Sequence, residues 1–157
     1  MYKRILVPVD GSPTSQLGLQ HAVGLAKSLG ARLRLLNVVD ELSVMPAVDA
    51  YAVVDLAAMI AALKEGGRKV LDESAAVAAR AGIEVEEALV ETHGHHVSDF
   101  IVREAKDWGA DVICMGTHGR RGISKLLLGS DAERVLHEAT TPVLLVRSKS
   151  PAATPAR

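Results

Sequence analysis

The chain has 157 residues, of which 48% are hydrophobic and 24% are charged, and its formal net charge is −1. This length fits one domain, and this composition is typical of a globular protein with its own hydrophobic core. A net charge so close to zero excludes attraction of the whole surface to nucleic acid or to an anionic membrane, so any recognition of an anion must be local.

Cysteine usage and the lack of a targeting signal set expectations for the compartment. Cys114 is the single cysteine, which excludes an internal disulfide and fits a reducing environment. No signal peptide precedes the first apolar run, and Lys64 and Lys69 interrupt the longest apolar region before it could cross a bilayer. We therefore expect a cytoplasmic protein with no membrane and no nucleic acid as partner.

Short aliphatic runs alternate with segments of helical spacing along the chain. The runs predict strands at residues 5–9, 33–39, 83–90, 112–115 and 143–146, and apolar stripes predict helices around residues 19–29, 60–77, 101–108 and 131–139. Strands separated by helices predict an α/β fold in which a parallel sheet is covered by helices on both faces. The third run, IEVEEALV, contains glutamates and predicts a more exposed edge strand.

Capping residues and glycines predict where the helices begin and end. Ser12 can cap the first helix, Pro13 suits its first turn, and Gly30 can end it in a left-handed conformation. Gly66 and Gly67 fall inside the second helix, where each glycine costs about 1 kcal/mol relative to alanine. Because the apolar spacing keeps its phase across this pair, we predict one helix with a weak point.

A glycine-rich loop follows the fourth predicted strand. Residues 116–130 read GTHGRRGISKLLLGS, with four glycines, three basic side chains and no carboxylate. Parallel sheets bind ligands beyond the carboxyl ends of their strands, and a helix N-terminus attracts anions. Arg120 and Arg121 can donate charge-assisted hydrogen bonds to phosphate oxygens. The loop therefore predicts a phosphate site, and the alternative is a surface loop whose arginines are merely solvated.

Two familiar phosphate motifs are absent from the sequence. No glycine in the loop is followed by lysine and a hydroxyl residue, as a Walker A loop requires. The first predicted strand is followed by DGSPTSQLG rather than by G-x-G-x-x-G, the dinucleotide-binding fingerprint. A different phosphate-binding arrangement is therefore expected.

The chain resembles the universal stress proteins (UspA-like) over nearly its whole length. The most specific element is the spacing G-x2-G-x9-G-[ST], and the segments ILVPVDGS, GADVICMGTHGR and TTPVLLVR are also similar to this family. The resemblance implies one Rossmann-like domain at residues 1–147, with a five-stranded parallel sheet in the order 3-2-1-4-5. The remaining residues, 148–157, are small, polar and proline-bearing, a composition that predicts a disordered tail. The resemblance further implies the branch of the family that binds ATP.

The resemblance also implies which residues contact ATP. Asp10 would face the ribose or the phosphates, and Val39 would hold adenine through its backbone. The ligand role of Asp10 is preferred, because the carboxylate could accept from ribose hydroxyls or hold Mg²⁺, and the alternative is a turn-forming aspartate before Gly11. The full set implied for ATP is Pro8, Val9, Asp10, Val39, Met115, Gly116, Gly119, Arg120, Gly129 and Ser130.

Asp131 departs from the family pattern, which often has a small apolar residue after the Gly-Ser pair. A carboxylate in the first turn of a helix complements the helix dipole by about 0.3–1 kcal/mol. Next to a triphosphate it would repel the ligand unless a divalent cation such as Mg²⁺ intervened. We therefore expect Asp131→Ala to tighten ATP binding without Mg²⁺.

The histidine group His93, His95 and His96 invites a metal interpretation, because histidine is a common ligand. The preferred alternative is a polar turn before a helix whose start Ser98 or Asp99 assists, since three neighbouring histidines rarely form a site without a set geometry. We interpret His118, in the glycine-rich loop, as an exposed or ligand-adjacent side chain rather than as a catalytic base, and Cys114 as a core residue.

Two apolar segments favour association. Val44, Met45 and Val48 could form a lid on the adenine side or contact another subunit, and an apolar last strand at a sheet edge tends to find a partner strand. The resemblance implies a homodimer through Pro142, Val143, Leu144, Leu145 and Val146. The function expected is that of a nucleotide-responsive dimeric stress module. The alternatives are a slow ATPase whose turnover acts as the switch and a nucleotide-free interaction protein.

Overall fold

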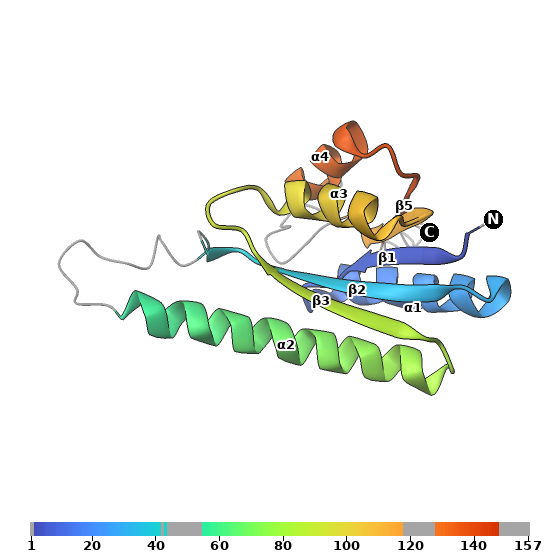
Figure 1. The fold of residues 1–157 in the computed structure, drawn as a ribbon, viewed down its shortest axis with the longest axis horizontal. Coiled ribbons are helices and arrows are strands. Elements are labelled where there is room, and N and C mark those ends of the chain that lie inside the picture. The colour runs from blue at the N-terminus through green and yellow to red at the C-terminus, as the bar shows by residue number, and fades with distance from the viewer. Residues whose placement is uncertain (1, 42, 44–54, 118–127, 148–157) are drawn as a thin grey trace, which may run out of the picture.

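The computed structural model describes residues 2–41, 43, 55–117 and 128–147, and within them strands and helices alternate in a doubly wound α/β arrangement (Figure 1). All pairs of neighbouring strands are parallel, and the order in the sheet is β3-β2-β1-β4-β5, which confirms the predicted fold. The elements are β1 (Arg4–Pro8), α1 (Pro13–Leu29), β2 (Arg32–Val39), α2 (Leu56–Arg80), β3 (Val85–Glu91), α3 (Val97–Trp108), β4 (Val112–Gly116), α4 (Ser130–Glu138) and β5 (Val143–Val146).

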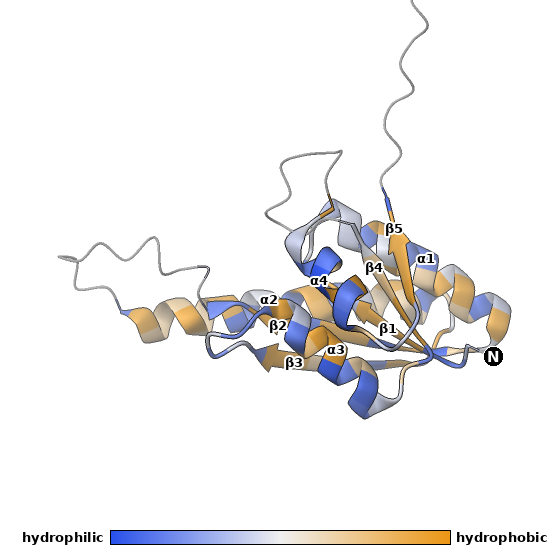
Figure 2. Cartoon of the chain, turned by 90° about the horizontal axis from the view of Figure 1, so that it is seen from above, coloured by the Kyte–Doolittle hydropathy of each residue, from blue (hydrophilic) through white to orange (hydrophobic). Residues whose placement is uncertain are grey.

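The hydrophobic core lies in two layers, one on each face of the sheet. Successive strand residues point to opposite faces, so Ile5 and Val7 join the layer under α1 and α2, whereas Leu6 joins the layer under α3 and α4. Figure 2 shows hydrophobic residues running along the strands between these helices. Burial on both faces explains why the central strands read as continuous aliphatic runs.

The ends of α1 follow the sequence signals. The backbone N–H of Ser15 donates to Ser12 Oγ at 3.2 Å, and Gly30 ends the helix with φ +60°, as predicted. The predicted apolar stripe is wrong at its end, because Leu29 is 39% exposed. Leu29 is the last residue of the helix, beside the cap, where the chain already turns toward β2.

Helix α2 is continuous through Gly66 and Gly67, which confirms one helix rather than two. A Cβ at Gly67 would collide with Oδ1 of Asn37 and would approach Leu89 Cδ1 to 2.8 Å, whereas a Cβ at Gly66 would meet nothing within 4 Å. Gly67 therefore lets the helix approach the sheet closely. The predicted stripe is wrong at Val77, which is 36% exposed, because the buried face runs instead through Gly67, Leu71, Ser74 and Ala78.

The last strand, β5, has the predicted bounds, and the boundaries of the other four strands differ from the predictions by at most two residues. β1 ends at Pro8, but the N–H of Val9 still donates to the carbonyl of Leu36 at 2.9 Å. β3 is an edge strand with mostly half-buried residues, as its glutamates predicted, and β5 is the opposite edge. Among the described residues, no helix is both long and apolar enough to cross a membrane.

Candidate functional site

The turn after β1 places a carboxylate at the edge of the sheet. Oδ1 of Asp10 accepts a hydrogen bond of 2.9 Å from the N–H of Ser12, and Gly11 has φ +80°. Ser15 Oγ accepts from the N–H of Asp10 at 3.4 Å and donates to the carbonyl of Ser12 at 3.0 Å. The turn-forming role considered for Asp10 is therefore present, and it fixes the position of this side chain.

A buried amide on β2 supports the same turn. Nδ2 of Asn37 donates to the carbonyl of Val9 at 2.8 Å, and Asn37 is only 6% exposed. Asn37 lies where a helix packs closely, because Gly67 of α2 leaves room for its side chain. The ends of β1 and β2 and the middle of α2 are thus joined through one polar side chain.

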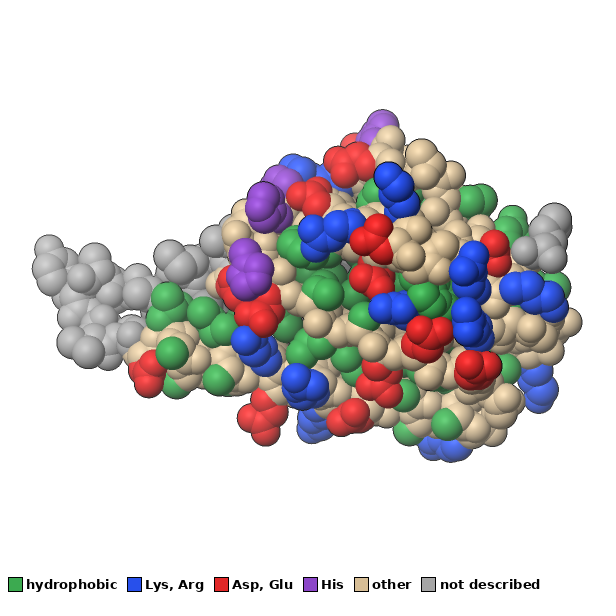
Figure 3. Space-filling view, viewed as in Figure 1, with side chains coloured by type: hydrophobic (Ala, Val, Ile, Leu, Met, Phe, Trp, Pro, Cys, Tyr) green, Lys and Arg blue, Asp and Glu red, His purple; other side chains and the backbone are tan. Residues whose placement is uncertain are grey.

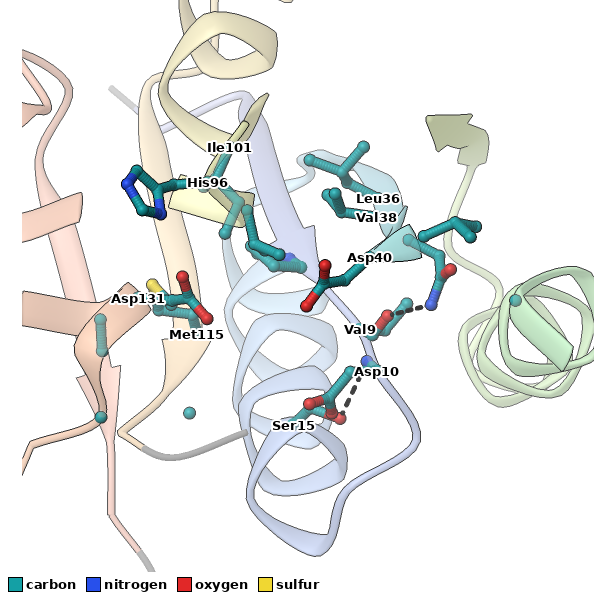
Figure 4. A pocket seen from close by; sticks show the side chains of 18 of the residues that line it. Val9, Asp10, Ser15, Leu36, Val38, Asp40, His96, Ile101, Met115 and Asp131 are labelled. Carbon is teal, nitrogen blue, oxygen red and sulfur yellow. Dashed lines mark hydrogen bonds between the residues drawn. The ribbon is translucent and has the colours of Figure 1, made fainter. Parts of the chain in front are cut away.

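A cavity of about 530 Å³ opens between the carboxyl ends of β1, β2 and β4 and the first turn of α4 (Figure 4). This is the place where the strand order reverses, and doubly wound folds bind ligands at such a point. Helix α2 forms the opposite wall. The residues around the cavity include Ser15, Asn37, Val38, Asp40, Leu63, Gly66, Gly67, Val70, His95, His96, Ile101, Thr117, Asp131 and Arg134.

Eight of the ten residues expected to contact a nucleotide line this cavity. They are Pro8, Val9, Asp10, Val39, Met115, Gly116, Gly129 and Ser130. The other two, Gly119 and Arg120, lie outside the described residues, as do His118, Arg121, Val44, Met45, Val48 and the tail at 148–157. The carbonyl of Val39 accepts a hydrogen bond from the N–H of Thr92 at 3.0 Å. One lone pair of this oxygen is therefore used in the pairing of β2 with β3.

Helix α4 begins at the cavity. Gly129 is its N-cap residue and Ser130 its first residue. The Ser130 hydroxyl could have been expected from the sequence either to cap this helix or to donate to a phosphate, and the capping alternative is wrong. The N–H of Gly129 donates to the carbonyl of Thr117 at 2.8 Å, and the N–H of Thr117 donates to the carbonyl of Val146 at 3.0 Å. These bonds hold the helix start beside the end of β4, with its partial positive charge at the cavity.

Charged side chains of both signs surround the cavity. Asp10, Asp40 and Asp131 contribute carboxylates, and Arg134 contributes a guanidinium. Figure 4 shows the carboxylates of Asp40 and Asp131 pointing toward the space between them, with His96 on the α3 side. An anionic ligand here meets a helix N-terminus and an arginine but also several carboxylates, an arrangement that favours an anion accompanied by a cation.

Cys114 takes no part in this chemistry. It is fully buried in β4, its Sγ donates to the carbonyl of Gly18 at 3.4 Å, and burial raises the pKa of its thiol to about 11. The prediction of a core residue is confirmed. Met115, the next residue, points to the opposite face and reaches the cavity.

Sequence reasoning missed the contribution of α2 and of Asn37. The second aliphatic run, LRLLNVV, has two polar side chains, Arg34 and Asn37. The uncharged amide of Asn37 among aliphatic residues was the signal available in the sequence. His95 and His96 line the cavity from the start of α3, where the N–H of His96 donates to Asp99 Oδ2 at 3.3 Å. His93 lies apart from them, within reach of Glu41.

The fold is a doubly wound parallel α/β sheet with a crevice at its switch point, the position at which proteins of this fold class bind ligands. The model of the family described as "Universal stress protein family" matches residues 1–147. The chain belongs to the universal stress protein family.

Individual relatives agree with this assignment. A universal stress protein of Methanocaldococcus jannaschii is 36% identical over 147 residues, which cover 94% of this chain and 83% of that protein. A solved member of the family from Burkholderia pseudomallei is 35% identical, with a TM-score of 0.75 and coverage of 94% and 97%. The universal stress protein of Archaeoglobus fulgidus in complex with dAMP shares the fold at 23% identity, with a TM-score of 0.64 and coverage of 93% and 98%.

Proposed function

We propose that this protein binds an adenine nucleotide, ATP, in the cavity at the carboxyl ends of β1, β2 and β4. The observation that carries the proposal is the convergence of Asp10, Val39, Met115 and Ser130 on one cavity from separate segments of the chain. The dAMP complex of the Archaeoglobus fulgidus protein supports the choice of an adenine nucleotide, since it has the same fold.

The proposed roles follow the cavity from its apolar to its polar side. Adenine lies near Val39 and Met115, and Pro8 and Val9 form the wall beside it. Asp10 accepts hydrogen bonds from ribose hydroxyls or lies near the phosphates. The phosphates lie at the start of α4, against the backbone amides near Gly129 and Ser130. Gly116, Gly119 and Arg120 complete the set.

We propose Mg²⁺ as the companion of ATP. The cavity is lined by Asp10, Asp40 and Asp131, and carboxylate oxygens are ligands that suit this ion. The ion would offset repulsion between these carboxylates and the phosphates. The protein's own residues orient the nucleotide, and the dication supplies charge neutralisation when bound.

We further propose that the protein acts in the cytoplasm as a homodimeric stress module that responds to nucleotide. β5 is an edge strand of the described sheet and Leu144 in it is 38% exposed, features that favour pairing with a second copy. Pairing would use Pro142, Val143, Leu144, Leu145 and Val146. Val146 of β5 accepts a hydrogen bond from the N–H of Thr117, which lines the cavity. Through this bond, nucleotide in the cavity would influence the strand that forms the dimer.

The test is to release and identify any nucleotide that the purified protein retains, and to titrate the emptied protein with ATP and Mg²⁺ by calorimetry. Gly119→Val should abolish retention, because a branched side chain would obstruct the phosphates. Gly24→Val is the matched control, since Gly24 is exposed on α1, away from the cavity, and a Cβ there meets nothing within 4 Å.

Each outcome of this test separates the candidate functions. Intact ATP in the extract supports a binding module, and steady accumulation of ADP with Mg²⁺ supports a slow ATPase. Absence of both retained nucleotide and a calorimetric signal would overturn the proposal in favour of a nucleotide-free interaction protein. Sedimentation with and without ATP measures the dimer.

A further inference from the structure

Two glutamates and a histidine gather outside the nucleotide cavity, at the ends of β2 and β3. These are Glu41, Glu91 and His93, which we call the glutamate–histidine cluster. One ligand atom of each residue lies within 4.8 Å of the others. Nδ1 of His93 is 3.6 Å from Oε2 of Glu41. We propose that the glutamate–histidine cluster is a binding site for a transition-metal dication, with Zn²⁺ as its reference ion.

The backbone beneath the cluster is fixed by the sheet. Val39 of β2 is paired in register with Glu91 of β3, and the N–H of Thr92 extends the ladder by donating to the carbonyl of Val39 at 3.0 Å. Glu41 and His93 each follow their strand's last paired residue by two positions. The three side chains therefore come from the ends of two neighbouring, paired strands, which lowers the cost of bringing the ligands together.

The distances suit coordination after small side-chain rotations. Zn²⁺ binds histidine nitrogen and carboxylate oxygen at about 2.0–2.2 Å, so ligand atoms in a tetrahedral site are roughly 3.3 Å apart. The 3.6 Å separation between His93 and Glu41 is close to this value. Three protein ligands leave the fourth position for water or for an exogenous ligand.

The chemistry of the ligand set selects the class of ion. Imidazole nitrogen with carboxylate oxygen suits Zn²⁺, Co²⁺ and related ions, whereas Mg²⁺ and Ca²⁺ prefer oxygen ligands alone. Two ionised glutamates and one neutral imidazole carry two negative charges, which a dication balances. The His93 side chain is 72% exposed, so an ion can reach the cluster from solvent.

A protein cation already occupies part of this position. Nζ of Lys64, on α2, lies 2.8 Å from Oε1 of Glu91. In Figure 3, histidine, acidic and basic side chains gather at the end of the visible face where β2 and β3 end. A dication that binds both glutamates displaces this ammonium, so Lys64 acts as a competitor whose removal strengthens metal binding.

The experiment titrates chelator-treated protein with zinc chloride by calorimetry, in the absence of nucleotide, and records the visible spectrum with Co²⁺. We expect one site per chain. His93→Ala and Glu91→Gln should each weaken Zn²⁺ binding at least about tenfold and remove the Co²⁺ bands. His95→Ala and His96→Ala are the matched controls, since these histidines line the other cavity, and they should leave binding unchanged.

Lys64→Met is the second test variant. It should tighten Zn²⁺ binding by several-fold, because the ion no longer competes with the Lys64 ammonium for Glu91, and an exposed ion pair of this kind is weak. Circular dichroism of each variant checks that the exposed substitutions leave the fold intact. Wild-type protein that takes up no Zn²⁺, or binding that survives both His93→Ala and Glu91→Gln, would overturn the proposal. Because nucleotide is absent throughout, neither result bears on ATP binding.

Discussion

Asn37 of β2 donates a buried hydrogen bond of 2.8 Å to the carbonyl of Val9, one residue before the turn that holds Asp10. This bond couples the second strand to the end of the first strand that lines the cavity. Val9 is 4% exposed, so its carbonyl has little access to water if the amide is lost.

Asn37→Leu should lower the free energy of unfolding by about 1–3 kcal/mol, because the substitution leaves a buried carbonyl unsatisfied. It should also weaken binding of ATP with Mg²⁺, since the Asp10 turn loses its support. Urea denaturation and calorimetry measure the two effects. Ser28→Ala, which removes an exposed hydrogen bond of 3.0 Å to Gly24, is the control and should change neither. Unchanged stability in Asn37→Leu would contradict the supporting role.

Gly66 and Gly67 form a natural matched pair. Gly67→Ala should destabilise the protein by about 1–3 kcal/mol, because its Cβ would meet Asn37 and Leu89. Gly66→Ala should instead stabilise it by up to about 1 kcal/mol, because alanine is the better helix former and its Cβ meets nothing within 4 Å. Thermal or urea unfolding of both variants gives the comparison. Equal effects at the two positions would show that the close approach at Gly67 carries no energetic weight.

Asp111 ties the starts of β1 and β4 together in a pH-dependent way. Its Oδ2 accepts from the N–H groups of Lys3 and Arg4 at 2.7 and 2.9 Å, and these two bonds hold the pKa of Asp111 below its usual value of 3.8. Because the folded pKa is depressed, the stabilisation is complete above the unfolded-state pKa and is lost as pH falls through the folded pKa.

Asp111→Asn should therefore cost stability at about pH 7, and the difference from wild type should shrink as pH falls below the unfolded-state pKa of about 3.8 and on through the lower pKa of the folded protein. Urea titrations across this range measure the difference. A gap that stays constant with pH would mean that the carboxylate charge does not matter to the two backbone bonds.

Asp131 tests the balance between carboxylates and phosphate in the proposed site. Asp131→Asn should tighten ATP binding without Mg²⁺ by about fivefold, the equivalent of about 1 kcal/mol for two unit charges about 4 Å apart in water. With Mg²⁺ the gain should be smaller or reversed. Calorimetry in chelator and in magnesium buffer makes the comparison. Weaker binding in both buffers would show that Asp131 helps the nucleotide directly.

Cys114 should be inert in the folded protein. Burial removes it from solvent and raises its thiol pKa to about 11, so the reactive thiolate is scarce. A chromogenic thiol reagent should label Cys114 of the native protein only as fast as the protein unfolds. In denaturant, the same reagent should label Cys114 at once. Fast labelling of native protein at neutral pH would contradict the core position of this residue.

The sequence predicted the strands well because burial on both faces turns each into an aliphatic run between helical patterns. It also located the Asp10 turn and the glycine at the start of α4, which depend on local chemistry. Asn37 and Gly67 could not be paired from the sequence, because their contact depends on how closely a helix lies on a sheet. The same holds for His93 and Glu41, which are brought together by strand register.

The order of strands in the sheet implies that the two halves of the chain can fold at different times during synthesis. β1, β2 and β3 are neighbours in the sheet and complete within the first 91 residues, so a nascent chain can assemble them before β4 leaves the ribosome. The crevice lies on the seam where β4 later joins β1. The crevice therefore forms only after β4 and α4 pack against the first half of the chain, and an incompletely synthesised chain lacks it.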